Sequence, residues 1–211
     1  APGGEGGYTL LRDIHKSFDV EPIAETFQSL PEDLDVLLIA QPPLLSPRQE
    51  WLIDQFILRT GRAVILVDPA AKTVASTGPF NMSDAATSSS LMAWGDAWGV
   101  ELSTAAVADA ASALPVPVDT GGGRIEELAH PLFLGIPAGD MNQDDLITAD
   151  LSRAVNFGAP GAFSTEDLAA TLEMTPLLST GPSPSFIDAS DAITDMAPQQ
   201  VLRQYQTEPA P

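Results

Sequence analysis

The residue with the clearest chemical potential in this sequence is Asp68, which directly follows the apolar run Ala63–Val67. The carboxyl ends of buried strands form the edge at which open α/β sheets bind ligands. Asp-Pro is equally a good turn initiator, so a purely structural role for this carboxylate stays open. We predict a crevice for a ligand or a partner at this edge, formed by Gln41, Ser46, Asp68 and Lys72.

The residue types for nucleophilic catalysis are poorly represented. The chain has no cysteine, which removes thiolate nucleophiles, disulfides and cysteine-based metal sites. The segment Gly181-Pro182-Ser183-Pro184-Ser185 departs from the Gly-x-Ser-x-Gly nucleophile elbow at its last position and is stiffened by proline. The two histidines stand where structural roles are usual: His15 near a helix end and His130 before a proline. We therefore predict no catalytic residues.

The patterns that could bind phosphate or metal are incomplete. The strand expected before Gln41 ends in Ala40-Gln41-Pro42-Pro43, whereas phosphate binding needs glycines and free backbone N–H groups. Gly121-Gly122-Gly123 lacks the Lys-Ser/Thr pair of a P-loop. The run Asp140–Asp145 alternates oxygen-bearing side chains as a calcium loop does, but its sixth position is Asp145 and its twelfth is Leu151. We predict no cofactor and no metal, with helix capping as the favoured role of this acidic run and adventitious calcium binding left open.

The net charge of −20 restricts the possible partners. Nine basic residues are scattered singly along the chain, so no cationic cluster could displace counterions from a nucleic acid. An anionic membrane surface would repel the chain for the same reason. No apolar run reaches the roughly 18 residues of a membrane span. Because both ends read as loops, we expect a fragment of a longer membrane-anchored protein, with membrane contact only through segments outside this chain.

A strand–helix–strand unit is expected to position Asp68. Asp35–Ala40 and Ala63–Val67 are continuous apolar runs, as in parallel strands that are buried on both faces. Between them, Ser46 caps a helix over Pro47–Arg59, and Gly61 ends it. A crossover of this kind is right-handed in nearly all proteins. The side chains expected to face inward from the helix are Trp51, Ile53, Phe56 and Ile57.

The remaining patterns are less regular. Leu91, Trp94 and Trp98 share one face of a helix expected over 83–98, and we interpret this stripe as core packing, with a sugar-stacking platform as the alternative. We expect residues 1–180 to form one α/β domain and residues 181–211 to be an extension or linker. The other expected elements are strands at 100–102, 131–136 and 175–180, a turn at 120–123, a helical turn at 143–146 and helices at 8–17 and 198–205, whereas 105–113 is ambiguous.

Several segments, taken in order, resemble the GldG-type family of gliding-motility-associated ABC transporter auxiliary proteins. The resemblance is strongest where the helix end Ile53–Arg62 leads into an apolar strand that closes with Asp68-Pro69. The other similar segments are Asp35–Pro42 with Leu45-Ser46, Leu91 with Trp94 and Trp98–Glu101, Asn156-Phe157 with Gly161, and Thr175–Thr180.

The resemblance implies an α/β fold: a Rossmann-like three-layer sandwich with a mainly parallel sheet, similar in layout to class I amidotransferases. It implies a place on the periplasmic face of the bacterial inner membrane, with an ABC permease and ATPase as partners. It implies no reaction and no catalytic residues, and the missing thiol agrees, because amidotransferase chemistry needs that nucleophile.

Three functional hypotheses follow. The first is a non-enzymatic extracytoplasmic binding or scaffold domain of an ABC-type transport system. The second is a hydrolase or carbohydrate-processing enzyme, which would need two carboxylates about 5–10 Å apart, taken from Asp68, Asp84 and Asp96. The third is an interaction protein without any ligand. Converging acids around the crevice would favour the second.

Overall fold

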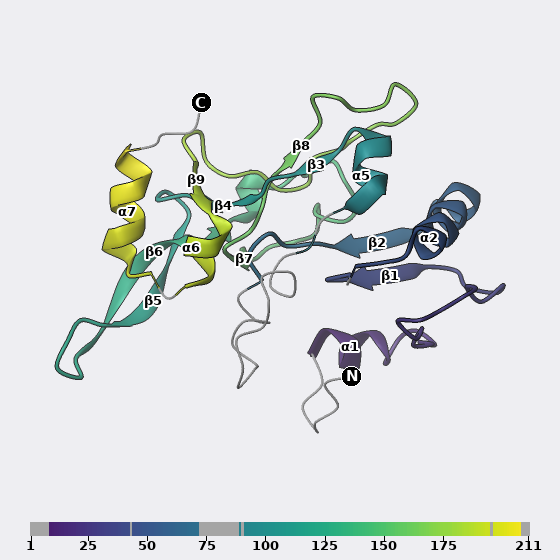
Figure 1. Cartoon of the computed structure of the whole chain (residues 1–211). Coiled ribbons are helices and arrows are strands. Elements are labelled where there is room, and N and C mark those ends of the chain that lie inside the picture. Colours follow the sequence, from purple (N-terminus) through teal and green to yellow (C-terminus); the bar gives the residue numbers. More distant parts are fainter. Residues whose placement is uncertain (1–8, 43, 72–88, 90, 195, 208–211) are drawn as a thin grey trace. The chain divides into compact units, whose positions relative to one another are not determined.

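The computed structural model describes residues 9–42, 44–71, 89, 91–194 and 196–207 (Figure 1). The chain forms two compact units, one within residues 1–35 and 45–61 and the other within 36–44 and 62–211. Helices α1 (Thr9–Ile14) and α2 (Pro47–Thr60) belong to the first unit, and the strands belong to the second. No helix in the described ranges combines the length and the apolar character that a bilayer crossing requires.

Helix α2 begins at the predicted Pro47 and ends at Thr60, one residue after the predicted Arg59. The Ser46 side chain accepts the Gln49 N–H at 3.4 Å, and Gln49 Oε1 accepts the Ser46 N–H at 3.0 Å, which is a reciprocal capping box. The Gln49 amide also donates to the Glu25 carbonyl at 2.6 Å, so the cap is tied to the preceding loop. At the other end, Gly61 adopts φ 64° and donates its N–H to Ile57.

The inward face of α2 differs from the prediction at one residue. Ile53 and Phe56 are buried as expected, but Trp51 is 49% exposed. At 3.6 residues per turn, Trp51 lies roughly 140–160° around the helix from both buried residues, so all three cannot share one face. The Arg48 guanidinium lies 4.6 Å from the centre of the Trp51 ring and covers part of it.

The predicted parallel pair is present in the second unit. Strand β1 (Leu37–Ala40) pairs with β2 (Ala63–Leu66) in parallel, from Leu37 opposite Ala63 to Ala40 opposite Leu66. The expectation that both faces are buried is wrong. Side chains alternate across a strand, and the face that carries Leu38, Val64 and Leu66 is exposed by 36%, 46% and 43%.

The other strand pairings are antiparallel. They join β5, β6 and β7 into one sheet, β3 to β8, and β4 to β9. The bounds are β3 Glu101–Leu102, β4 Ala105–Ala108, β5 Ala113–Asp119, β6 Ile125–Ile136, β7 Val155–Gly158, β8 Phe163–Ser164 and β9 Ser185–Asp188. The mainly parallel sheet of a Rossmann-like sandwich therefore stays a prediction, to which the described residues contribute one parallel pair.

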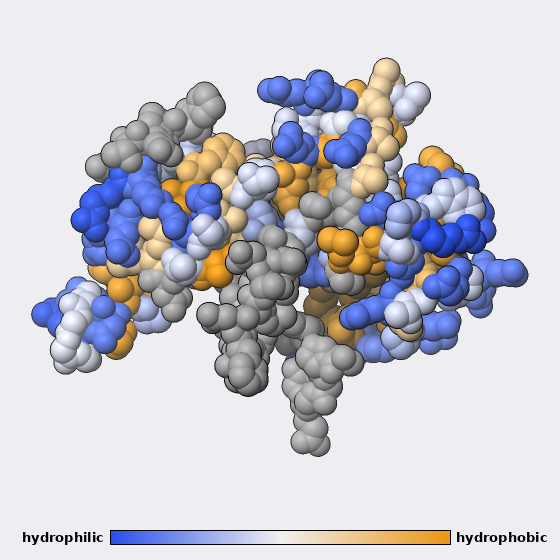
Figure 2. Space-filling model, in the orientation of Figure 1, coloured by the Kyte–Doolittle hydropathy of each residue, from blue (hydrophilic) through white to orange (hydrophobic). Residues whose placement is uncertain are grey.

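Strands β5 and β6 form a hairpin that projects from the second unit (Figure 1). Its turn lies at the predicted glycines, where Thr120 donates its N–H to the Arg124 carbonyl at 2.9 Å. Pro115 and Pro117 lie two residues apart in β5, so the same edge of the strand lacks N–H donors twice. That edge ends the sheet. Figure 2 shows the hairpin tip as mainly hydrophilic.

Strand β6 is longer than the predicted 131–136 because it accommodates Pro131 in an irregularity. Leu114 of β5 lies opposite His130, whereas the preceding Ala113 lies opposite Leu134. Pro131 falls within this register shift, where its missing N–H breaks no ladder hydrogen bond. The strand therefore continues through Pro131, the residue at which the sequence predicts that it begins.

Strand β4 resolves the ambiguous alanine-rich segment. Ala106 and Ala108 pack in one apolar cluster, with Leu132 and Ile187. Val107, on the opposite face, packs in a second cluster formed with Leu134, Ile136 and Met141. The strand is therefore buried on both faces.

The described residues after 181 contribute to the core of the second unit. Strand β9 pairs with β4, and Val201 of helix α7 (Pro198–Thr207) is fully buried with Leu132 and Ile187. Figure 1 shows α7 beside β6. In this structure the segment expected to be an extension or linker is an integral part of the unit. Its other helix is α6 (Ala189–Ile193), and the unit also has helix α5 (Met92–Trp98) and the 3₁₀ turn η1 (Ala138–Asp140).

Two other predicted elements are not formed. The segment 175–180 makes an isolated bridge, from Leu178 to Met141, in place of a strand. The segment 143–146 makes turns and no helix.

Candidate functional site

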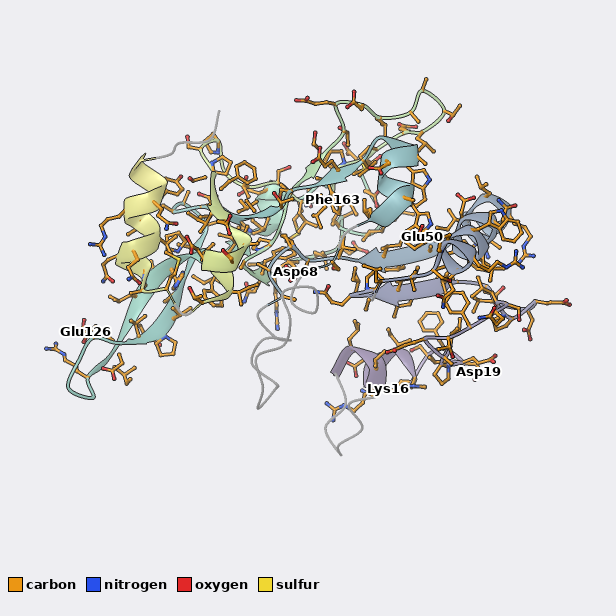
Figure 3. All side chains as sticks on the ribbon, viewed as in Figure 1. Lys16, Asp19, Glu50, Asp68, Glu126 and Phe163 are labelled. Atoms are coloured by element: carbon orange, nitrogen blue, oxygen red, sulfur yellow. The ribbon has the colours of Figure 1, made fainter. Side chains whose placement is uncertain are left out.

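Asp68 lies where the chain leaves β2, two residues beyond its end (Figure 3). Its Oδ1 accepts the Ala70 N–H at 2.8 Å, which makes the turn that the Asp-Pro sequence predicts. Burial raises the pKa of Asp68 because the charged carboxylate loses water, and the hydrogen bond from Ala70 opposes this in part. The turn and a perturbed carboxylate thus coexist at one residue.

Ser89 links the carboxyl ends of the two parallel strands. Its hydroxyl donates to Oε1 of Gln41 and accepts the Asp68 N–H at 2.9 Å, while its own N–H donates to the Asp68 carbonyl at 2.8 Å. Gln41 has φ 47°, a left-handed conformation that is uncommon outside glycine, and its N–H donates to Leu66. Sequence reasoning missed Ser89 because it lies within the helix expected over 83–98, whereas α5 begins only at Met92 and Ser89 is outside it.

Of the four residues of the predicted crevice, the structure brings two together. Gln41 and Asp68 share Ser89 as a hydrogen-bond partner, so the prediction that they lie at one edge agrees with this geometry. Ser46 belongs to the first unit, where it caps α2. Lys72 lies outside the described residues. Binding of a ligand or a partner at this edge stays a prediction.

A cleft of about 440 Å³ opens beside Asp68 within the second unit. Its walls come from β3, β6, β7 and β8 and the turn after β7, and they are mainly aromatic and aliphatic. Among the described residues that line it, Asp68 is the one titratable group, and Phe163 of β8 is half exposed (Figure 3). The lining residues are Val67, Asp68, Leu102, Phe133, Asn156, Phe157, Gly158, Pro160, Gly161 and Phe163.

The acids of the enzyme hypothesis do not converge in the described part of the chain. Asp96 is exposed on α5 and does not line the cleft. Asp84 lies outside the described residues. Among the described residues, one carboxylate lines the cleft, whereas glycoside hydrolysis requires a pair.

His130 has a structural role in the second unit. Its Nε2 lies 3.0 Å from the Met196 carbonyl, and its Nδ1 accepts the Leu132 N–H at 3.3 Å. Since Nδ1 accepts, the hydrogen-bond network assigns the proton to Nε2. The ring also packs edge-on against Phe133 at 5.0 Å. With both nitrogens engaged, the imidazole has no free position for proton transfer to a substrate.

Asp109 is a second carboxylate that directly follows a strand, in this case β4. Its residue is only 2% exposed. Oδ1 accepts the Ala111 N–H at 2.8 Å, and Oδ2 accepts both the Ser112 hydroxyl at 2.9 Å and the Gly181 N–H at 3.0 Å. These donors hold the wall of another cleft, of about 450 Å³, which is lined mainly by small residues and by Asp140.

The calcium-like run uses its oxygens locally. Asn142 Oδ1 accepts the Asp144 N–H, and Asp145 Oδ1 accepts the Ile147 N–H, both at 2.9 Å. These are side-chain turns rather than helix caps. Across the described residues, no group of three or more acidic or histidine side chains is arranged to hold a metal ion.

A comparison with known protein families shows to which family the chain belongs. The model of the family described as an ABC-type uncharacterized transport system matches residues 2–211. The chain belongs to this family. It is an auxiliary component of an ABC-type transport system, which confirms the broader family that the sequence resembles. No curated protein and no solved structure matches the chain.

Membership in the ABC-type auxiliary family bears on how the Asp68 cleft is interpreted. The family description implies association with an ABC-type transport system. The GldG-type subfamily stays a hypothesis, because the match covers the whole auxiliary family.

Proposed function

We propose that this chain is a non-enzymatic, extracytoplasmic binding domain that serves an ABC-type permease and ATPase. The observation that carries the proposal is the cleft at Asp68, in a chain of the auxiliary family. Clefts of about 300–1,000 Å³ with apolar and aromatic walls and few polar groups are typical ligand sites. The cleft falls in this range.

The groups around the cleft favour binding over turnover. Among the described residues, Asp68 is the one acid that lines it, and the buried His130 has both ring nitrogens engaged. Hydrolysis by acid–base chemistry would need a second titratable group within hydrogen-bond reach of the substrate. The arrangement therefore supports a site that holds a ligand without transforming it.

We also propose that the β1–β2 pair is part of a Rossmann-like layout. Ligands of open α/β sheets bind outside the carboxyl ends of parallel strands. Asp68 lies at this end of the pair and lines the cleft. The exposed face that carries Leu38, Val64 and Leu66 would be covered in such a three-layer arrangement.

The proposed place is the periplasmic face of the inner membrane, close to the permease. The net charge of −20 disfavours direct adsorption to anionic lipid. We therefore propose that membrane contact is made by anchoring segments outside this chain and by the permease.

Co-purification tests the partnership. The protein is tagged in its natural setting, extracted from membranes in mild detergent, and its associated proteins are quantified by mass spectrometry against an untagged strain. We expect enrichment of the ABC permease and ATPase encoded with it. Recovery of the protein without the permease would contradict the partnership.

The lack of cysteine makes the location directly testable. An Asp96→Cys variant introduces a single thiol at an exposed position of α5. In intact cells with a permeabilised outer membrane, a membrane-impermeant maleimide should label this thiol. The unsubstituted chain is the matched control, because it has no thiol. Labelling only after lysis of the inner membrane would contradict an extracytoplasmic location.

A further inference from the structure

The carboxylate of Asp68 is only partly satisfied by the described residues. Oδ1 accepts the Ala70 N–H, and no described donor reaches Oδ2. None of the described residues that line the cleft is a lysine or an arginine. The raised pKa of Asp68 comes from burial, the response of a carboxylate that has lost water without gaining a cation. A cation in the cleft would restore that balance.

The walls of the cleft determine what kind of cation fits. Phe133 and Phe163 line the cleft and carry aromatic rings, which attract cations through the negative potential of their faces. Hard metal ions need several oxygen ligands, and the described residues hold no cluster of three candidate ligands. Val67 and Leu102 add aliphatic surface. The suitable cation therefore carries its own apolar groups around the charge.

Two glycines shape these walls. A Cβ on Gly161 would lie 2.8 Å from Leu102 Cδ1 and 2.8 Å from Pro69 Cδ, so only glycine allows this close packing. A Cβ on Gly158 would lie 3.5 Å from Phe133 Cε1 and would cover part of the ring. Asn156, also among the lining residues, is exposed and carries an amide.

We propose that this cleft binds an organic cation of the alkylammonium class, with the charged nitrogen at Asp68 and the alkyl groups against Phe133 and Phe163. This inference rests on the proposed binding role and names the ligand class. The net charge of −20 attracts cations to the domain and raises their local concentration. The ammonium group belongs either to a free small molecule or to a lysine of a partner, since the two share the same chemistry.

Titration of the 211-residue chain with choline chloride tests the inference. The control ligand is 3,3-dimethyl-1-butanol, in which a neutral carbon replaces the charged nitrogen. Aromatic resonances of Phe133 and Phe163 and amide resonances of Gly158 and Gly161 are followed by NMR at constant ionic strength. We expect saturable shifts with choline and binding at least about tenfold weaker for the alcohol. Equal binding of both compounds, or no saturable shift with choline, would overturn the inference.

Matched variants locate the charge. Asp68→Asn removes the charge but keeps an oxygen for the Ala70 N–H, and it should weaken choline binding by about tenfold or more. Asp96→Asn removes the same charge from the exposed face of α5 and should leave binding unchanged. Phe163→Leu keeps apolar surface without the ring and should weaken binding about threefold. Wild-type affinity in Asp68→Asn would overturn the inference, provided that its amide spectrum shows a folded chain.

Two further measurements distinguish a free small molecule from a partner's lysine, and the cation site from the proposed partnership with the permease. N-acetyl-lysine methylamide stands for a partner's lysine, and tighter binding than choline would assign the site to a side chain. Looser binding would assign it to a free small molecule. Choline binding without co-purification of the permease would contradict the partnership alone. Co-purification without choline binding would overturn the cation site alone.

Discussion

Asp68 and Asp109 occupy the same local setting in two regions of the second unit. Each closely follows a strand, β2 or β4, and in each the Oδ1 atom accepts the N–H two residues ahead at 2.8 Å. The regions differ in what reaches the second oxygen. Oδ2 of Asp109 accepts from Ser112 and from Gly181, which lies 72 residues away, whereas no described donor reaches Oδ2 of Asp68.

The difference shows how one sequence motif serves two purposes. The carboxylate of Asp109 is buried, and its three donors replace the water that it has lost. It therefore fastens one chain segment to another. Asp68 is only half-buried, and it lines a cleft with mainly apolar walls. A carboxylate left with spare acceptor capacity in such a place is suited to a ligand.

The largest expected effect is the loss of the Asp109 carboxylate. Asp109→Ala leaves the N–H groups of Ala111 and Gly181 and the Ser112 hydroxyl without their acceptor, which should destabilise the chain by about 2–4 kcal/mol. Asp68→Ala removes one backbone hydrogen bond and should cost about 1 kcal/mol or less. Urea denaturation of both variants measures the difference. Equal losses would break the distinction between the two aspartates.

A smaller effect is expected at Gly181. A Cβ at this position would lie 3.1 Å from Oδ2 of Asp109, closer than ordinary packing, so Gly181→Ala should cost about 1 kcal/mol. Gly139 is the matched control, because a Cβ there would meet nothing within 4 Å and Gly139→Ala should be nearly neutral. If Gly181→Ala leaves the free energy of unfolding unchanged in the same denaturant series, the contact between Gly181 and Asp109 tolerates displacement.

The smallest effects concern protonation. Asp68 should titrate above the ordinary aspartate pKa because of burial, and Asp188 below it because Ser190 donates from its hydroxyl and its N–H. Carbon-13 NMR of the carboxyl groups measures both. Coincident pKa values for the two aspartates would contradict the contrast in their surroundings.

The two shifts have opposite consequences for stability. Because the folded pKa of Asp68 is raised, the folded state holds its proton longer, and stability falls as pH rises through that pKa. The free energy of unfolding of Asp68→Asn, relative to that of the wild type, should therefore rise with pH, by about 0.5 kcal/mol or less. The lowered pKa of Asp188 stabilises the folded state above the ordinary aspartate pKa, and this contribution is lost as pH falls through the folded pKa.

Features that depend on neighbouring residues were predictable. The capping pair of Ser46 and Gln49 and the left-handed Gly61 delimit α2 as expected, since each acts within one helical turn. The aromatic stripe also packs as expected: Trp94 is buried, and its ring lies 6.4 Å from that of Trp98. The parallel pairing of β1 and β2 follows from the crossover length.

Features that depend on distant pairing were not predictable. Strand β9 was taken for part of a linker, because its short apolar core shows its role only beside β4. Ser89 carries no signal of its own, and it matters only because two strand ends meet there. The walls of the Asp68 cleft come from strands far apart in the sequence.

The sequence alone determined the strand–helix–strand unit, the position of Asp68 at a strand end, and the family resemblance, because these depend on short-range backbone preferences and on the order of motifs. Only the tertiary structure decided that Asp109 is buried with three hydrogen-bond donors and that Asp68 lines a cleft. The donors that satisfy Asp109 arrive through long-range folding, and the charge balance of a buried carboxylate depends on every group packed around it.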